Sequence, residues 1–448
     1  MSTNRFRSLV LAGVAVLGGL LMFSSPTMAA DAPLDCHIGV YRLADGAVVD
    51  VGAADGGALR WRRFDGESGA LAPGAGGAWT SSYGWTGRPD GRTVRFSDCT
   101  AGRIDFGGLA GRRIPLAATE ATFHSNDVDL VGRLVLPKGS GRVPIVVLIH
   151  GSESSSARDF YALQRLLPSQ GVGVFVYDKR GTGASGGRYT QDYSVLADDA
   201  VAAMREARRL AGRRAGRVGY QGGSQGGWVA PLAASRAPVD FVIVSFGLAV
   251  SPADEDNEEI ELEMKLAGHG PAETAKALEI AAAAQDAFAS LFTEESIARF
   301  IAVRDKHRAE PWFKDLRGNL TRYLLPLDAE QLRAARAQFN FGTPLHYDAM
   351  AVLRGLGTPQ LWVLGEDDLD APSAETSRRL TDLAAHGRPV TLAIFPHAEH
   401  GMTEYEIGPD GERVSTRFAP GYFAMMRDFA LGRMHGRYGA GRVSGARP

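Results

Sequence analysis

The stretch "RVGYQGGSQGGWVAPLAAS" (residues 217–235) decides the fold, because it sets one serine, Ser224, between two pairs of glycines. A short apolar run precedes this serine, and an alanine-rich apolar run follows it. Glycine inside a helix or strand costs about 0.5–1 kcal/mol relative to alanine. Such a cluster indicates either a flexible linker or a turn too tight for side chains. Since apolar elements adjoin the serine on both sides, we predict a strand, a sharp turn at Ser224 and a helix.

The segments on either side continue an alternation of strands and helices. The runs "VPIVVLIHG", "VGVFVYDKRG", "VDFVIVSFG", "TPQLWVLGEDD" and "PVTLAIFPHAEHG" are typical of buried strands, and most of the segments between them are typical of helices. This order predicts an α/β fold with a mostly parallel sheet and helices on both faces. The alternation is interrupted by a charged helical insertion over residues 251–345, which is either a cap over a ligand site or an oligomer contact.

The N-terminal part has a different character. Asp-Gly steps at residues 45–46, 65–66 and 90–91 separate short alternating segments, which predicts a small β-rich domain over residues 31–118. Its aromatic residues fit a sheet core better than a ligand platform. Cys36 and Cys99 are the two cysteines of the chain. They predict a disulfide, with two buried thiols as the alternative.

The first residues have the layout of a secretory signal peptide. Arg5 and Arg7 precede the apolar run "LVLAGVAVLGGLLMF", and small residues follow up to residue 30. An uncleaved anchor is the alternative; after removal of the signal we expect no stable membrane span and a periplasmic or secreted protein. We further predict that residues 119–250 and 346–434 form the core of the α/β fold. Residues 435–448 are predicted to be a mobile tail.

Composition excludes some partners. The chain of 448 residues is 45% hydrophobic and 22% charged, with a net charge of −2. Nothing in this balance points to nucleic acid, and the sequence leaves the oligomeric state open. We also expect no cofactor.

Serine needs a base to become a nucleophile, and the base needs an orienting acid. Carboxylates follow the strand "PQLWVLG", and among them we choose Asp368, with Asp367 as the alternative. His397 and His400 follow the last strand, and His400, just before a glycine, is the preferred base. The order Ser, Asp, His is the one expected of such a sheet. The two histidines also have a metal-ligand spacing, but no suitably spaced third ligand accompanies them, so we predict no metal.

Two backbone amides are candidates for an oxyanion hole. The amide of Gln225 lies at the predicted start of the helix after Ser224. The second donor is expected in the loop after "IVVLIHG", where the amide of Ser152 is the best candidate. His150 is expected to support this loop.

These motifs resemble those of the α/β-hydrolase family, in its branch of exported carboxylesterases and serine aminopeptidase-like hydrolases. The resemblance covers residues from about 119 to 434 and rests on "IHGSESSSARDF", "VYDKRGTGASGG", "GYQGGSQGGWVAPLAAS", "GEDDLDAP" and "HAEHG". It implies Ser224 as nucleophile, Asp368 as acid and His400 as base. The N-terminal β domain is not part of the usual core.

The function expected from these features is hydrolysis of carboxylic esters with small to medium acyl groups through an acyl-enzyme. A serine aminopeptidase acting on short peptides is the near alternative, since the same motifs serve both. A non-catalytic ligand-binding protein on a hydrolase scaffold is the alternative from another class. The expected partner is therefore a small-molecule ester or a short peptide.

Overall fold

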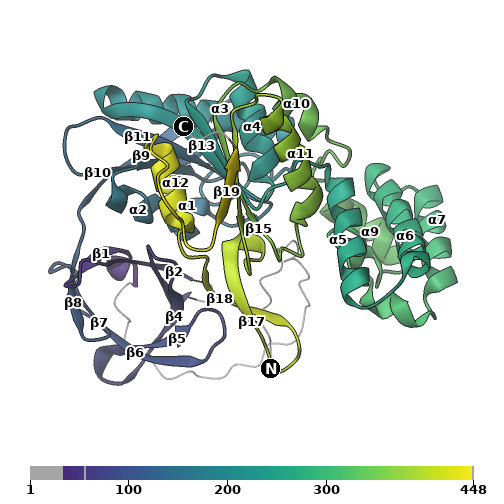
Figure 1. Cartoon of the computed structure of the whole chain (residues 1–448), viewed down its shortest axis with the longest axis horizontal. Helices are drawn as coiled ribbons and strands as arrows, with labels where there is room; N and C mark the ends of the chain where they lie inside the picture. Colours follow the sequence, from purple (N-terminus) through teal and green to yellow (C-terminus); the bar gives the residue numbers. More distant parts are fainter. Residues whose placement is uncertain (1–33, 55–56, 446–448) are drawn as a thin grey trace, which may run out of the picture.

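The structure is a computed structural model that describes residues 34–54 and 57–445 (Figure 1). The predicted signal peptide, residues 1–30, lies outside these ranges. The described chain forms a small barrel, a large mixed sheet with helices on both faces, and a helical insertion at one side of the molecule. The predicted α/β-hydrolase fold with a β-rich N-terminal part is thus confirmed.

Eight antiparallel strands close into the N-terminal barrel. Each strand pairs with the next along the chain, and β8 returns to pair with β1. Its interior is filled by apolar and aromatic side chains, with Trp61 and Phe106 in edge-to-face contact at 5.1 Å between ring centroids. The aromatic residues at these positions are therefore core. The strands are β1 (Gly39–Leu43), β2 (Val48–Ala53), β3 (Leu59–Arg63), β4 (Ser68–Pro73), β5 (Ala78–Tyr83), β6 (Pro89–Phe96), β7 (Arg103–Phe106) and β8 (Leu109–Arg113).

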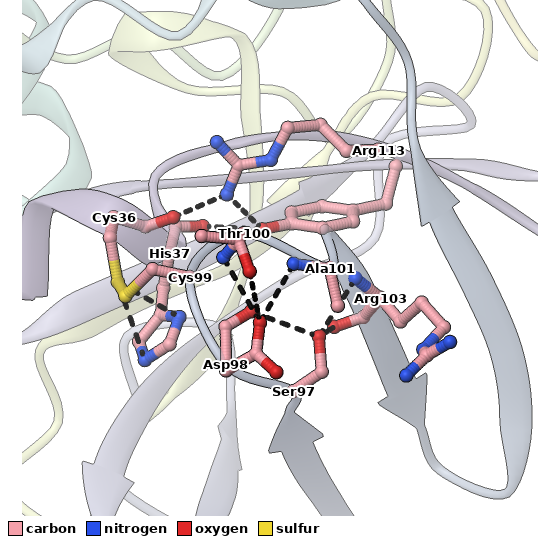
Figure 2. The surroundings of a disulfide bond; sticks show 10 residues. Cys36, His37, Ser97, Asp98, Cys99, Thr100, Ala101, Arg103 and Arg113 are labelled. Atoms are coloured by element: carbon pink, nitrogen blue, oxygen red, sulfur yellow. Dashed lines mark hydrogen bonds between the residues drawn. A yellow bond between two sulfur atoms is a disulfide. The ribbon is translucent and has the colours of Figure 1, made fainter.

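The predicted disulfide between Cys36 and Cys99 is present (Figure 2). It ties the segment before β1 to the connection between β6 and β7. Arg113 donates hydrogen bonds to the Cys36 carbonyl and, at 2.7 Å, to the hydroxyl of Tyr41. The disulfide therefore lies beside a polar cluster, and Cys99 itself is exposed to solvent.

The second sheet has the strand order β19-β16-β15-β14-β13-β11-β12-β10-β9. The strands from β16 to β12 in this order run parallel, whereas β19, β10 and β9 are antiparallel to their neighbours. The carboxyl ends of the parallel strands therefore share one edge, where ligand sites of such sheets form. The strands are β9 (Leu116–Ser125), β10 (Val128–Pro137), β11 (Val143–Ile149), β12 (Gly173–Tyr177), β13 (Ala215–Gly223), β14 (Phe241–Ser245), β15 (Gln360–Gly365), β16 (Val390–Phe395) and β19 (Arg442–Gly445).

Both faces of this sheet are covered. On β11, Ile145, Val147 and Ile149 pack into one core, and Val146 and Leu148 pack into the other. This two-sided burial explains why a strand such as β11 is apolar throughout. The first core includes residues of helices α3 (Tyr193–Ala211), α4 (Gly226–Arg236), α10 (Ala349–Gly355) and α11 (Ser373–Ala385), and the second includes residues of α1 (Ala157–Phe160), α2 (Leu163–Leu166) and α12 (Tyr422–Ala430).

The insertion between β14 and β15 is helical and has an apolar core of its own. Acidic residues are concentrated at the start of this insertion, between Asp254 and Glu263. Its first helix starts with a capping box formed by Ser251 and Asp254, so part of this acidic run serves to begin a helix. Within the described ranges, no helix combines the length and apolarity that a bilayer span requires. The helices are α5 (Pro252–Leu266), α6 (Pro271–Ala289), α7 (Glu294–His307), α8 (Thr321–Leu324) and α9 (Ala329–Gln338).

Two features differ from the sequence-based expectation. Strand β9 begins at Leu116, so it crosses the predicted boundary at residue 118 and already belongs to the large sheet. In the segment predicted as a mobile tail, β19 pairs with the edge strand β16. The physical reason is the open edge of β16, whose backbone groups need partners. Arg442 of β19 adds an ion pair to Glu366 at 2.6 Å.

The barrel packs against the large sheet's domain through backbone and buried ionic contacts. A hairpin of β17 (Thr403–Ile407) and β18 (Arg413–Phe418) adjoins the barrel, and the amide of Phe418 donates to the Gly66 carbonyl at 2.9 Å. Fully buried Asp50 of β2 accepts a hydrogen bond from Arg165 of α2 at 3.1 Å. The hairpin begins just after His400, so the barrel contacts a segment that is continuous with this histidine.

Candidate active site

Ser224 lies in the tight turn between β13 and α4. Its φ angle is +51°, a left-handed conformation that is rare for a residue with a side chain. A Cβ on Gly222 would lie 2.1 Å from the Gly226 carbonyl oxygen, and one on Gly226 would lie 2.8 Å from that of Ile149. The glycines are therefore required by close backbone approach. Gln225 is the N-cap residue of α4, where backbone amides have no intrahelical acceptor.

Asp368 and His400 follow the neighbouring parallel strands β15 and β16. Nδ1 of His400 lies 3.0 Å from Oδ2 of Asp368, and the Asp368 side chain is 1% exposed. The other oxygen of this carboxylate accepts a hydrogen bond from the Ala371 amide at 2.8 Å. The ring of Phe246 contacts His400 edge to face, with centroids 4.9 Å apart. The carboxylate and these contacts fix the orientation of the imidazole and favour a proton on Nδ1.

The electrostatic surroundings of His400 favour its protonated form. Burial alone would lower the pKa of His400, but the charge and hydrogen bond of Asp368 oppose this, and Asp370 and Glu255 add to their effect. The result is a pKa raised to about 9 from the ordinary value of 6.5. A proton taken up by this imidazole is therefore held strongly.

Ser224 and His400 line one cavity of about 340 Å³ between the sheet edge and the helical insertion. Ser152 and Gln225, the predicted amide donors, line the same cavity. This volume is within the range of small-molecule sites. The structure thus brings these four residues together and places Asp368 behind His400. The wall contributed by the insertion and the segment after it is largely apolar and includes Phe288, Leu291, Leu320, Tyr323, Phe339 and Phe341.

The sequence analysis did not single out the polar residues that the insertion adds to the cavity. Glu255 of α5 and Asn319 line it, together with Asp370 from the loop after β15. Burial raises the pKa of Glu255 to about 8, although His400 and a hydrogen bond from Asn319 oppose the shift. The only sequence signal for Glu255 was the acidic run at the start of α5, which does not show which carboxylates turn toward the sheet.

His150 supports the loop after β11, as expected. Burial lowers its pKa to about 4, and its Nε2 bonds to the Tyr177 carbonyl. The imidazole is therefore neutral and donates this hydrogen bond. It sits beside the Tyr177 ring in an edge-to-face contact at 4.7 Å.

The alternative candidates, His397 and Asp367, lie in the same loops but away from the cavity. His397 has a side chain that is 87% exposed, and its Nδ1 is 3.7 Å from Oδ2 of Asp367. Asp367 also accepts a hydrogen bond from Tyr405 at 3.0 Å. Neither residue lines the cavity that contains Ser224. The structure therefore separates the pair Asp367 and His397 from the pair Asp368 and His400.

Comparison with known proteins identifies the family. A family model described as serine aminopeptidase, S33, matches residues 142–406, more than half of the chain. An esterase from Pyrococcus furiosus is similar over 64% of this chain and 84% of its own, with 17% identity and a TM-score of 0.42. An acylaminoacyl peptidase from Pyrococcus horikoshii is similar over 79% of this chain and 52% of its own, with 14% identity and a TM-score of 0.41. No curated protein matches the sequence.

Proposed function

The chain belongs to the serine aminopeptidase S33 family and is a serine hydrolase, and we propose that it cleaves carboxylic esters with small to medium acyl groups through Ser224, His400 and Asp368. One observation carries the proposal: Ser224 and His400 face the same cavity, and Asp368 holds Nδ1 of His400 at 3.0 Å. In this arrangement the carboxylate orients the imidazole, which can then accept the proton of a serine hydroxyl in the same cavity.

The proposed reaction has two halves. Oγ of Ser224 attacks the substrate carbonyl carbon while Nε2 of His400 takes the hydroxyl proton, and Asp368 stabilises the imidazolium. The amides of Ser152 and Gln225 donate to the oxyanion. The carbonyl then re-forms, the ester C–O bond breaks, and His400 passes its proton to the leaving alcohol. A water molecule, deprotonated by His400, attacks the acyl-enzyme. The bond to Oγ of Ser224 then breaks, His400 returns the proton to Oγ, and the acid is released.

The cavity supports an ester of modest size as substrate. Its volume of about 340 Å³ lies at the lower end of the range for small-molecule sites. The apolar wall with Phe288, Leu291 and Phe339 suits an acyl chain, because burying apolar surface there is favourable. The helical insertion, acting as a cap, would admit only compact substrates.

The experiment compares the mature protein, from about Asp31, with Ser224→Ala on p-nitrophenyl acetate, butyrate and octanoate and on aminoacyl and dipeptidyl nitroanilides. We expect rapid turnover of the short-chain esters that Ser224→Ala abolishes. Ser235→Ala, which changes an exposed serine of the same helix α4, is the matched control and should retain full activity. Equal background rates in the wild type and Ser224→Ala would contradict the proposal.

Aminopeptidase activity is the second candidate, and Glu255 is the observation that favours it. Glu255 and Asp370 line the cavity that contains Ser224. Burial raises the pKa of Glu255 to about 8, and a protonated amino group bound beside it would favour the ionised carboxylate. If the natural substrate carries such an amine, Glu255→Gln should raise KM for aminoacyl nitroanilides at least tenfold. KM for p-nitrophenyl butyrate should then stay unchanged. Faster turnover of the anilides than of the esters would make this the primary function.

We also propose that the protein is exported and that residues 1–30 are removed. The disulfide between Cys36 and Cys99 supports this, because such bonds persist in oxidising compartments. Intact-mass measurement of protein from the periplasmic and culture fractions should give a chain that begins near Asp31. A full-length chain in the membrane fraction would instead indicate an uncleaved anchor.

A further inference from the structure

Two residues from the segment after β12 hold the loop after β11 by its carbonyl groups. Nζ of Lys179 donates to the Gly151 carbonyl at 2.9 Å. The hydroxyl of Tyr189 donates to the carbonyl of the next residue, Ser152. The side chain of Lys179 is almost fully buried, with 2% of the residue exposed. Burying an ammonium group costs free energy of folding. The burial of Lys179 against one backbone carbonyl therefore indicates a role in this loop.

Peptide geometry connects this contact to the cavity. In a trans peptide the C=O and N–H groups point to opposite sides of the chain. The carbonyl of Gly151 and the amide of Ser152 belong to one peptide unit. When Lys179 holds that carbonyl, the Ser152 N–H is directed away from Lys179. Ser152 lies on the wall of the cavity that also contains Ser224.

We propose that Lys179 is a positioning residue for the oxyanion site: through the Gly151 carbonyl it orients the Ser152 amide toward the place where negative charge develops beside Ser224. This role rests on the proposed function. Tyr189 supports it by holding the carbonyl of the next peptide unit, which limits rotation of the chain around Ser152. An ammonium is suited to the task, because a charged donor makes a stronger hydrogen bond than a neutral one.

The surroundings of Lys179 hold its Nζ on the Gly151 carbonyl, as an ammonium below its pKa and as a neutral amine, which is still a donor, above it. Burial lowers the pKa of Lys179 to about 8, and the charge of Glu153 opposes this shift. The Tyr189 ring lies 4.6 Å from Nζ, which adds a cation–π contact. The same tyrosine accepts a hydrogen bond from Gln191 at 2.8 Å. These contacts lock the donor on one carbonyl.

Arg180 provides a matched control, because it is the adjacent residue and also a buried cation. Its guanidinium donates to both oxygens of Asp199 at 2.7 Å and to Asp127 at 3.4 Å. Among the described residues it makes no hydrogen bond to the loop after β11. Arg180→Met therefore removes a buried ion pair from the same segment without touching the Gly151 carbonyl. It should lower the melting temperature and leave kcat unchanged.

The test measures kcat and KM for p-nitrophenyl butyrate and the inhibition constant of a trifluoromethyl ketone, which forms a tetrahedral oxyanion on the serine. Lys179→Met should lower kcat about 10- to 100-fold, somewhat less than loss of a whole oxyanion donor, with KM within about twofold. Affinity for the ketone should fall by a similar factor. Tyr189→Phe, which keeps the ring, should show the same pattern more weakly, and it serves as the test if Lys179→Met does not fold.

Each contrary outcome has a distinct meaning. Lys179→Met, or Tyr189→Phe in its place, with wild-type kcat and wild-type ketone affinity overturns the positioning role while leaving the proposed function intact. An equal loss of kcat in Arg180→Met also overturns it, because the effect would then reflect stability of the segment. Wild-type protein without Ser224-dependent turnover overturns the proposed function and this role with it.

Discussion

Replacing Asp368 by asparagine removes the charge beside His400 while keeping the size of the side chain. The carboxylate is buried, it lies 3.0 Å from Nδ1 of His400, and its other oxygen accepts the Ala371 amide. If His400 is the base, it becomes an imidazolium in the transition state, and the carboxylate stabilises that charge. The asparagine amide can also favour the wrong imidazole tautomer.

The size of the effect follows from the pKa of His400, which is about 9 instead of 6.5. This difference corresponds to about 3 kcal/mol in favour of the imidazolium, at 1.36 kcal/mol for each pH unit. Since burial opposes the shift, Asp368 and its neighbours contribute at least this much. If Asp368 supplies most of it, Asp368→Asn should lower kcat at least about 10²-fold.

The assay is the full pH profile of ester hydrolysis. A base with a raised pKa is protonated, and inactive, below that pKa, so the wild-type rate should rise toward about pH 9. Asp368→Asn lowers the pKa of His400, so its acid limb should move to lower pH. The two proteins must therefore be compared on their alkaline plateaus.

Asp367→Asn is the matched control, since Asp367 is the adjacent carboxylate and bonds to Tyr405 instead of His400. It should keep kcat within about threefold of the wild type, in keeping with the small effect of most changes outside the site. The reasoning is refuted if Asp368→Asn retains wild-type plateau activity. It is equally refuted if Asp367→Asn loses as much activity as Asp368→Asn.

Three further predictions follow from other contacts. Glu255→Gln removes a carboxylate that helps raise the pKa of His400, so the acid limb of kcat/KM should move to lower pH; an unmoved limb in the pH profile would count against this. Replacing Cys36 and Cys99 by serine opens a loop with a sequence separation of 63, which should lower the free energy of unfolding by about 4 kcal/mol; urea denaturation measures this, and kcat should not change. Gly222→Ala places a Cβ 2.1 Å from a backbone oxygen, so activity should be lost and the melting temperature should fall; an active, stable variant would show that the turn adapts.

Local sequence patterns were sufficient to predict the fold class. The apolar runs of strands such as β11 are buried on both faces, and such burial leaves a composition that can be recognised without coordinates. The glycines around Ser224 indicated a turn, because glycine is needed where two backbone segments approach closely. The disulfide could be predicted from two cysteines, since they allow only one pairing.

The residues placed around Ser224 were predicted in part. The candidates for acid and base were found because they follow parallel strands, whose carboxyl ends share one edge of the sheet. Among them, His400 was preferred for its place just before a glycine, and Asp368 was preferred to Asp367. The structure brings these side chains together, and their catalytic roles stay a prediction. The tail was predicted incorrectly, because β19 pairs with the edge strand β16. This pairing uses backbone groups, and no side-chain pattern in residues 442–445 indicates it.

Only the tertiary structure decided what surrounds Ser224 and His400. Glu255 reaches the cavity because the helical insertion folds back over the sheet edge, and its sequence position among other acidic residues does not distinguish it. Lys179 meets the Gly151 carbonyl because β11 and β12 are neighbours in the sheet. Periodicity and turn residues are local properties that the sequence determines by itself. The cavity is formed by segments far apart in the chain, so its shape and charge are determined by how they pack.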